Sequence, residues 1–215
     1  ADTLNGLDAV ATWAVTGTNS GTYSSGGNSL SFLAVENLVG GNTDDTLTFT
    51  AFNTDRDIQI DAVGLVDGFD ISETNFAGVF KNVDTLVGST AVADSLTGLN
   101  AVSTWQPTVS NVQYISTNTL IITNIETLVG GSADDTLSFA SFATAGDIQI
   151  SAVGTVDGFD LTETSLAGLL FKNINTLTGS ISSSDILTGL DALSTWAVTG
   201  ADSGKYTRTN TLSFQ

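Results

Sequence analysis

The chain has 215 residues, of which 23 are acidic and 5 are basic, so its formal net charge is -18. That charge makes nucleic acid and anionic membrane surfaces poor partners. His, Cys and Met are absent, which excludes Ser-His-Asp triads, His-ligated zinc hydrolase sites, thiolate nucleophiles and disulfides. A hydrophobic content of 41% is sufficient to build a core.

The sequence contains no signal-peptide pattern, no apolar transmembrane stretch and no initiator Met. We therefore expect a mature chain or a fragment of a longer one. A Cys-free, acidic composition rich in Gly, Ser, Thr and Asn is typical of a bacterial extracellular protein that folds without disulfides.

A long internal repeat organises the chain. The segment ADTLNGLDAVATW at 1–13 returns as ADSLTGLNAVSTW at 93–105 and as SDILTGLDALSTW at 184–196. Between these copies, DIQIDAVGLVDGFDISET at 57–74 matches DIQISAVGTVDGFDLTET at 147–164. We therefore divide the chain into repeat 1 (1–92), repeat 2 (93–183) and a partial repeat 3 (184–215).

Each repeat contains two related halves of 41 to 50 residues. A Leu-Val-Gly-Gly step, or a variant of it, is followed within a few residues by an aspartate that begins an apolar run. The steps start at Leu38, Leu86, Leu128 and Leu177, and the aspartates are Asp45, Asp94, Asp135 and Asp185.

The local pattern predicts β-structure almost throughout. Residues 46–50, 57–61 and 118–123 alternate or cluster β-forming side chains between Gly, Asn, Asp and Ser, as strands do. Helical periodicity is nearly absent, and only residues 73–80 could form a helical turn or two.

The predicted fold is all-β. A β-solenoid resembling a parallel β-helix explains the repeat best, because its coils stack directly and need no linkers. Tandem β-sandwich domains of about 90 residues are the alternative. The partial third repeat favours the solenoid, since a sandwich cut in mid-unit would have too few strands.

Two acidic turns occupy equivalent positions, GGNTDDTLTF at 40–49 and GGSADDTLSF at 130–139. They resemble the calcium-binding nonapeptide of the repeats-in-toxin family, although Thr43 and Ala133 replace its third Gly. That likeness implies calcium ligation. The structural interpretation is a glycine corner closed by Asx-turns. The candidate ligands are Asp44, Asp45, Asp134 and Asp135.

A second acidic cluster, VDGFD, also recurs, and each copy is followed three residues later by a glutamate. Oxygen ligands at this spacing could hold a hard cation, while Asp-Gly is equally a turn signal, which we favour. The candidate ligands are Asp67, Asp70, Asp157 and Asp160.

Catalysis is not predicted. Paired carboxylates hydrolyse glycosides in some β-helical enzymes, but here both clusters recur at matched positions and no acidic pair is unique to one repeat.

The aromatic residues Trp13, Trp105 and Trp196, each followed by a Tyr, could stack on sugars. We favour a role in the core, because one fixed position per repeat is typical of stacked core layers.

Three copies of [AS]-D-x-L-x-G-L-[DN]-A-[VL]-x-T-W and two of [VI]-E-x-L-V-G-G-x-x-D-D-T-L resemble repeats of giant bacterial adhesins of the haemagglutinin-like and repeats-in-toxin-like kinds. The resemblance implies a non-enzymatic structural segment of an extracellular or cell-surface fibre or stalk. Its partners would be other copies of itself, further repeats or cell-surface glycans, without nucleic acid or membrane insertion. The alternative is a calcium- or glycan-binding module, with calcium as its cofactor.

Overall fold

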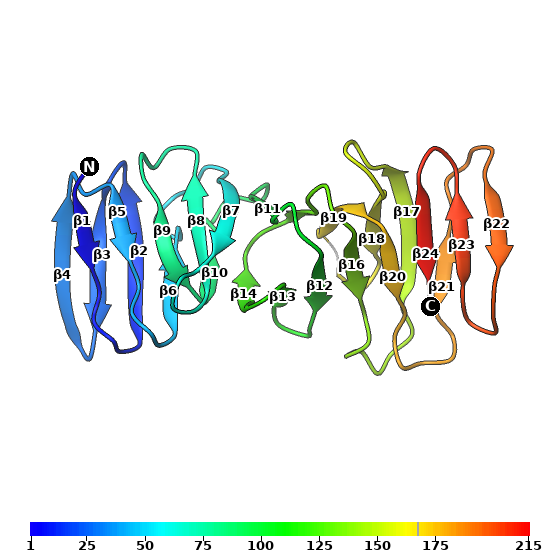
Figure 1. The fold of residues 1–215 in the computed structure, drawn as a ribbon, viewed down its shortest axis with the longest axis horizontal. Helices are drawn as coiled ribbons and strands as arrows, with labels where there is room; N and C mark the ends of the chain where they lie inside the picture. The colour runs from blue at the N-terminus through cyan, green and yellow to red at the C-terminus, as the bar shows by residue number, and fades with distance from the viewer. Residues whose placement is uncertain (167) are drawn as a thin grey trace. The chain divides into compact units, whose positions relative to one another are not determined.

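A computed structural model describes residues 1–166 and 168–215. The described chain is all-β, contains two large sheets and has no helix within that range (Figure 1). It forms two compact units. Unit 1 comprises residues 1–97 and 117–126, and unit 2 comprises residues 98–116 and 127–215.

The strands of unit 1 are β1 (Thr3–Asn5), β2 (Ala11–Gly17), β3 (Ser20–Ser25), β4 (Asn28–Leu33), β5 (Asn37–Val39), β6 (Asp45–Thr48), β7 (Asp57–Val63), β8 (Phe69–Glu73), β9 (Phe80–Val83), β10 (Thr85–Val87), β11 (Ser95–Thr97) and β14 (Thr119–Thr123). Those of unit 2 are β12 (Ser103–Pro107), β13 (Val112–Ile115), β15 (Thr127–Val129), β16 (Asp135–Ser138), β17 (Asp147–Val153), β18 (Phe159–Glu163), β19 (Leu170–Ile174), β20 (Thr176–Thr178), β21 (Ile186–Thr188), β22 (Thr195–Val198), β23 (Gly204–Thr207) and β24 (Thr211–Phe214).

Unit 1 contributes strands to both sheets. Its part of sheet A has the order β1-β5-β9-β8-β7-β11, and its part of sheet B has the order β14-β10-β6-β2-β3-β4. Strands β7, β8 and β9 form an antiparallel meander in sheet A, and β2, β3 and β4 form one in sheet B. The single strands pair in parallel, as β1 does with β5 and β2 with β6.

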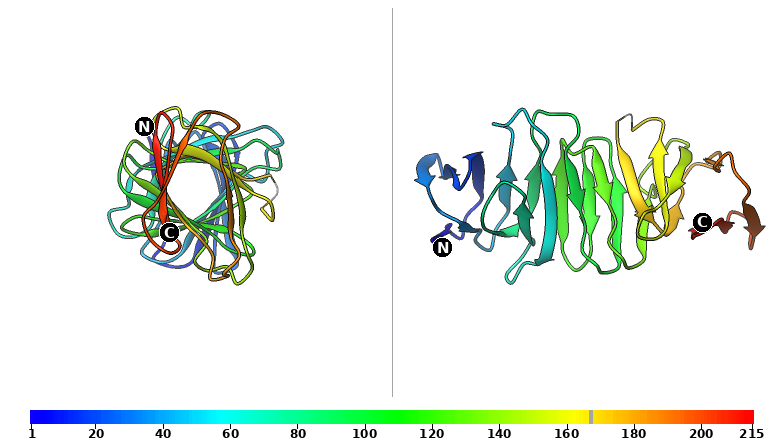
Figure 2. Two further views of the ribbon diagram at one scale, coloured as in Figure 1. Left: turned by 90° about the vertical axis from the view of Figure 1, so that its right-hand side faces the viewer. Right: turned by 90° about the horizontal axis from the view of Figure 1, so that it is seen from above.

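Unit 2 has the same organisation. Its part of sheet A has the order β15-β19-β18-β17-β21, and its part of sheet B has the order β22-β23-β24-β20-β16-β12-β13. The meanders are β17 to β19 in sheet A and β22 to β24 in sheet B, and the latter is orange to red in Figure 2. Strand β16 pairs in parallel with both β12 and β20.

The chain passes alternately between the two sheets. A half-repeat consists of one meander and two single strands, for example β2–β4, β5 and β6, and therefore makes three passes. Because three is odd, the next half-repeat begins on the opposite sheet. This accounts for meanders that occur first in sheet B and then in sheet A of unit 1.

Side chains from the two sheets meet in an apolar interior within each unit. Phe49, which follows β6 of sheet B, contacts Phe80 in β9 of sheet A at 5.9 Å between ring centroids. In unit 2, Phe159 of β18 contacts Tyr206 of β23 at 5.3 Å. Buried and less buried positions alternate along most strands, as the two-residue period of a strand requires.

The structure confirms the all-β prediction and the strands expected at 46–50, 57–61 and 118–123, which correspond to β6, β7 and β14. The stretch 73–80 forms a turn between β8 and β9, closed by a hydrogen bond from Phe76 N–H to Glu73 O at 3.0 Å. Within residues 1–166 and 168–215, no helix is long and apolar enough to cross a lipid bilayer.

The recurring aromatic residues form core layers in the first two copies. Trp13 and Trp105 are buried and pack against Tyr23 and Tyr114, with ring centroids 4.4 and 4.6 Å apart. Trp196 contacts Tyr206 in the same way but remains 45% exposed. The core interpretation is therefore confirmed for Trp13 and Trp105 and fails in part for Trp196, which lies in β22 at the edge of sheet B in unit 2.

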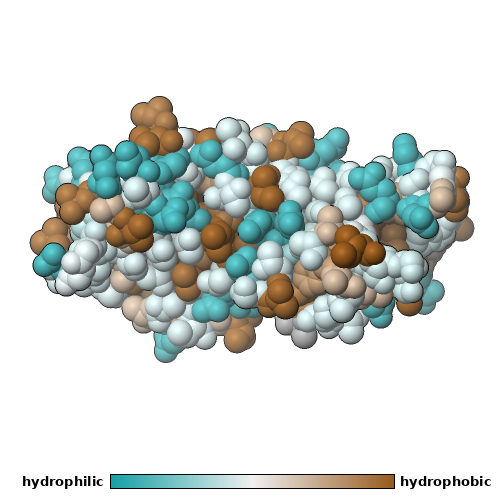
Figure 3. All heavy atoms as spheres, turned by 90° about the horizontal axis from the view of Figure 1, so that it is seen from below, coloured by the Kyte–Doolittle hydropathy of each residue, from teal (hydrophilic) through white to brown (hydrophobic). Residues whose placement is uncertain are grey.

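Exposed hydrophobic side chains are scattered on the face drawn in Figure 3, where brown residues are separated by hydrophilic and intermediate ones. Among the exposed hydrophobic residues of the described chain, several occupy equivalent repeat positions. Examples are Val10 and Val102, which are 66% and 69% exposed, and Val66 and Val156, which are 61% and 62% exposed.

Candidate functional site

The four recurring aspartates each begin, or closely precede, a short strand that follows a glycine-containing turn. In three of the turns the carboxylate accepts a backbone N–H from the turn itself. Asp45 accepts from Gly41 at 2.7 Å, Asp94 from Ser89 at 2.6 Å, and Asp185 from Ser180 at 2.8 Å. These bonds match the turn-closing role predicted for such aspartates.

The same turns are hydrogen-bonded to chain segments about 40 positions away. The Asp84 carboxylate accepts the Asp45 N–H at 2.8 Å, and the Asn175 amide oxygen accepts the Asp135 N–H at 3.0 Å. In the turns that end at Asp94 and Asp185, the carboxylate of that aspartate is instead the acceptor. Asp94 accepts the Arg56 N–H and Asp185 accepts the Gly146 N–H, both at 2.6 Å. Side chains of these turns therefore cross-link neighbouring passes of the chain inside each unit.

Burial perturbs the turn carboxyl groups. Asp45 and Asp135 are 1% and 0% exposed, and burial raises the pKa of each carboxyl to about 6. Burial likewise raises the pKa of Asp84 to about 6. Neighbouring carboxylates add to these shifts, with Asp84 and Asp67 acting on Asp45 and with Asp157 and Asp134 acting on Asp135.

The second acidic cluster divides into two environments. Asp70 accepts the Asn82 N–H at 3.3 Å and lies 4.0 Å from the Lys81 ammonium, and Asp160 accepts the Asn173 N–H at 3.2 Å. These two aspartates fix the ends of the strands that follow them, β9 and β19.

Asp67 and Asp157, by contrast, lie on the β7–β8 and β17–β18 turns close to the acidic glycine turns. Burial raises the pKa of both carboxyls, and Asp44 and Asp134 respectively raise them further. In each, Oδ1 is buried and has no hydrogen-bond partner among the residues that the structure describes. The fold thus brings Asp67 toward Asp44 and Asp45, and Asp157 toward Asp134 and Asp135.

The structure places the candidate ligands of the acidic turns in two different environments. Asp44 and Asp134 are exposed, whereas Asp45 and Asp135 are buried. The Asp45 carboxylate accepts the Gly41 N–H, and the Asp135 carboxylate accepts the Ser103 hydroxyl. Within the described ranges 1–166 and 168–215, no group of three or more acidic side chains is arranged to hold a metal ion.

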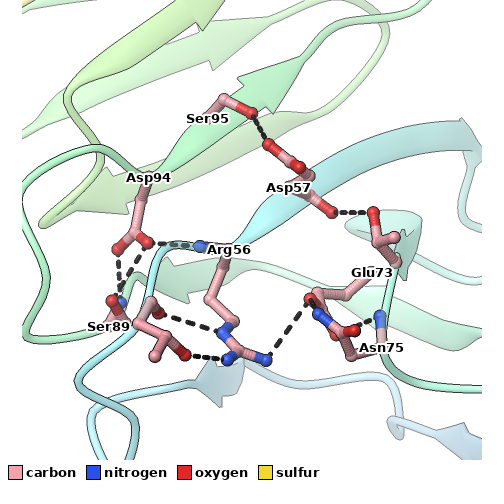
Figure 4. A network of polar contacts seen from close by, with 9 residues as sticks. Arg56, Asp57, Glu73, Asn75, Ser89, Asp94 and Ser95 are labelled. Carbon is pink, nitrogen blue, oxygen red and sulfur yellow. Dashed lines mark hydrogen bonds and ion pairs between the residues drawn. The ribbon is translucent and has the colours of Figure 1, made fainter.

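A buried ion pair was not anticipated from the sequence. Arg56 lies 3.5 Å from the Glu73 carboxylate, and both side chains are largely excluded from solvent (Figure 4). The guanidinium also donates to Thr54 O at 3.2 Å and lies 4.1 Å from the centre of the Phe52 ring. Because the Arg56 N–H is bonded to Asp94, this network joins β7, β8 and the turn before β11.

In unit 2, the equivalent buried glutamate, Glu163, makes backbone hydrogen bonds in place of an ion pair. Gly146 occupies the position equivalent to Arg56, and the buried Glu163 carboxylate instead accepts the backbone N–H groups of Ser165, Leu166 and Asp147 at 2.8, 3.0 and 3.3 Å. The Arg56 ion pair is therefore a local variant and not a fixed element of the repeat.

Two asparagines that connect these turns were also not predicted from the sequence. Asn82 and Asn173, both with positive φ, donate from their amides to Gly40 O and Gly130 O at 3.1 and 3.3 Å. The available signal was the matched pair FKNVDTL and FKNINTL at 80–86 and 171–177. A polar residue that recurs inside an otherwise apolar strand pattern indicates a special backbone position.

No family model matches the chain, and comparisons with curated proteins and with solved structures returned no match.

Proposed function

We propose that the chain is a non-enzymatic structural repeat segment of an extracellular bacterial fibre or adhesin stalk. The observation that carries this proposal is the use of the recurring aspartates. They occur at matched positions and engage backbone N–H groups of their own turn or of a neighbouring pass. Carboxylates engaged in this way serve to hold chain segments together.

The proposed architecture is a β-solenoid built from repeats with two related halves. Strict alternation between two sheets and parallel pairing of single strands support it, because stacked coils produce both features. The compact units also cut across the repeat borders, since residues 117–126 belong to unit 1. Tandem sandwiches would instead be expected to keep each repeat within its own unit.

The charge suits an exposed position. A net charge of -18 keeps the surface hydrated and limits lateral association unless salt or cations screen it. The proposal includes an extracellular or cell-surface location and assembly with further repeats. It includes neither nucleic-acid binding nor membrane insertion.

Electron microscopy of residues 1–215 in 150 mM salt, with a calcium chelator and then with millimolar calcium, tests the proposal. We expect linear assemblies in both buffers. The variant Val198→Lys is expected to disperse them, because a lysine on the edge strand β22 blocks strand pairing. Val198 is 79% exposed, and Val10→Lys at a 66% exposed loop position is the matched control. Dispersed particles of the unaltered protein in both buffers would contradict self-assembly.

The alternative function is a calcium- or glycan-binding module. The observation in favour of calcium is the pair of buried, unpartnered oxygens, Asp67 Oδ1 and Asp157 Oδ1, at equivalent positions beside acidic turns. Calcium titration followed by calorimetry distinguishes the two functions. Saturable binding that is lost in Asp67→Asn and Asp157→Asn, but retained in Asp61→Asn, supports the module. Absence of heat at millimolar calcium removes that candidate.

A further inference from the structure

The third copy of the repeat exposes a surface that the first two copies cover. Trp13 and Trp105 are 2% and 0% exposed, whereas the equivalent Trp196 is 45% exposed. The difference lies in strand pairing. Strand β2 is covered by β6 and β12 by β16, while β22 pairs with β23 alone within the described chain.

The covering element in unit 1 is one continuous segment, residues 35–48, which contains β5, the Gly-Gly turn and β6. It adds β5 to β1 with Leu4 opposite Leu38, and it adds β6 to β2 with Trp13 opposite Leu47. At its start, the Glu36 carboxylate accepts the Asp2 N–H at 2.7 Å. The segment thus contacts both sheets at once.

The turn of this segment fits closely against the receiving loop. A Cβ atom placed on Gly41 would lie 2.3 Å from Leu7 O, and one placed on Gly131 would lie 2.1 Å from Leu99 O. Neither contact is possible for a real side chain, so the second glycine of the turn is required. In unit 2, the turn gains a further bond from Ser132 N–H to the Asn100 side chain at 3.0 Å.

The third copy repeats the receiving residues. Leu187 and Leu190 correspond to Leu4 and Leu7, and Asp191 corresponds to Asp8 and Asn100. Leu190 N–H is held by the Tyr206 hydroxyl at 3.1 Å, as Leu7 N–H is held by Tyr23 at 2.8 Å, so the loop has the same support.

Two further positions at this edge match residues that bind the covering segment in the other copies. Ser194 corresponds to Ser103, whose hydroxyl donates to the Asp135 carboxylate. Among the described residues, no carboxylate accepts the Asp185 N–H, the counterpart of the Asp2 N–H that Glu36 binds.

A pocket with a mixed polar and apolar lining also lies beside β21 in unit 2. Its volume is about 460 Å³, and its lining includes Ile148, Leu177, Ile186, Leu187 and Phe214. In unit 1, Leu38 and Leu47 of the covering segment lie opposite Leu4 and Trp13 and are 2% and 0% exposed. Covering Leu187 and Trp196 with the two equivalent leucines would remove apolar surface from water and stabilise the complex.

We infer that the edge formed by β21 and β22 binds a strand–turn–strand segment of the form [VI]-E-x-L-V-G-G-x-x-D-D-T-L, the same element that covers the equivalent edge in the first two copies. The inference deepens the proposed function and rests on it, because it identifies the partner through which repeats join. The segment adds one parallel strand to each sheet and places its turn against Leu190 O.

The test uses the 215-residue protein and a synthetic peptide of residues 35–49, in 150 mM salt to screen the like charges of the two. Binding is measured by the anisotropy of labelled peptide and by tryptophan emission. We expect saturable binding and a blue shift of the emission as Trp196 becomes buried. Trp196→Phe is expected to remove the shift. Trp13 and Trp105 are already buried and serve as a constant background.

Two matched variants decide the geometry. A peptide with Gly41→Val is expected to bind at least tenfold more weakly, because its Cβ would meet Leu190 O. The protein variant Val198→Lys is expected to lose affinity to a similar extent, while Val10→Lys retains it. Equal affinity for the two peptides, or the absence of saturable binding, overturns the inference. Binding that tolerates Gly41→Val but is lost in Val198→Lys would indicate simple edge pairing without the turn, and it also overturns the inference.

The outcome is separable from that of the proposed function. Linear assemblies without peptide binding would reject this edge as the junction and leave the structural role intact. Peptide binding by a protein that never assembles would reject fibre formation by this chain and leave the binding edge intact.

Discussion

The Asp84 carboxylate accepts the backbone N–H of Asp45 at 2.8 Å, and the two carboxyl groups both have a pKa of about 6. Two acidic groups therefore share a partly buried position that links β6 to the segment between β9 and β10. This arrangement favours proton uptake by the folded protein, and it makes the stability of the fold depend on pH.

We predict that the protein is more stable at pH 5 than at pH 7.5. The folded-state pKa of Asp45, Asp84 and Asp135 lies near 6, above the value of about 3.9 in the unfolded chain. Between these two pKa values the folded state binds more protons than the unfolded state does. The free energy of unfolding therefore rises as the pH falls from about 7 to about 4. One pKa unit is about 1.4 kcal/mol, so coupled and partly screened groups should contribute about 2–4 kcal/mol in total.

Thermal unfolding followed by circular dichroism between pH 4 and pH 8 measures this effect. A change of that size corresponds to a midpoint shift of roughly 5–10 °C for a chain of this length. Below about pH 4 the trend should reverse. Hydrogen bonds from Gly146 and Ser180 outweigh burial and lower the pKa of Asp185, and the stability that this group contributes is lost on protonation. A midpoint that rises from pH 5 to pH 7.5 would contradict the assignment of these carboxyls.

Asp84→Asn is predicted to stabilise the protein at pH 7.5. Asn175 occupies the equivalent position in unit 2, where its amide oxygen accepts the Asp135 N–H at 3.0 Å, so an asparagine preserves the acceptor. The substitution removes one partly buried charge beside Asp45 and should add about 1 kcal/mol at neutral pH. Urea denaturation at pH 7.5 and pH 5 checks both the gain and its disappearance at the lower pH. Asp61→Asn, at an exposed position of β7, is the control.

The fold class was predictable because its signals are local and repeated. Alternating β-forming residues between glycine turns predicted β6, β7 and β14 at nearly their observed bounds. The repeat also predicted that Trp13 and Trp105 belong to core layers. What the pattern could not reveal is the sheet to which each strand belongs. The exchange of sheets depends on an odd number of passes per half-repeat, which becomes visible only when pairing is known.

The acidic positions were recognised, but their chemistry depends on distant partners. Asp44 and Asp45 are adjacent in the sequence, yet the first is exposed and the second is buried on the Gly41 N–H. Asp84 and Arg56 gain their roles from groups 39 and 17 residues away, Asp45 and Glu73. A sequence pattern records spacing along the chain, and these contacts are made between passes.

Arg56→Met is predicted to destabilise the protein by about 3 kcal/mol. The substitution leaves the Glu73 carboxylate, which is 4% exposed, without its cation, and an unpaired buried charge is costly. The double variant Arg56→Met with Glu73→Gln should recover more than half of the loss, since the glutamine oxygen can still accept the Asn75 N–H. Chemical denaturation of the two single variants and the double variant completes the cycle. Additive losses would show that the ion pair contributes nothing by itself.

Replacing the recurring tyrosines by phenylalanine is predicted to destabilise the fold at each copy. The hydroxyls of Tyr23, Tyr114 and Tyr206 accept the N–H of Leu7, Leu99 and Leu190 at 2.8, 2.9 and 3.1 Å. Removing one hydroxyl leaves a partly buried N–H unpaired and should cost about 1–2 kcal/mol. Urea denaturation measures each loss, with Thr22→Ala on the opposite face of β3 as the control. Because Phe keeps the ring that packs on the tryptophan, a loss below about 0.3 kcal/mol at all three positions would assign the tyrosines to packing alone.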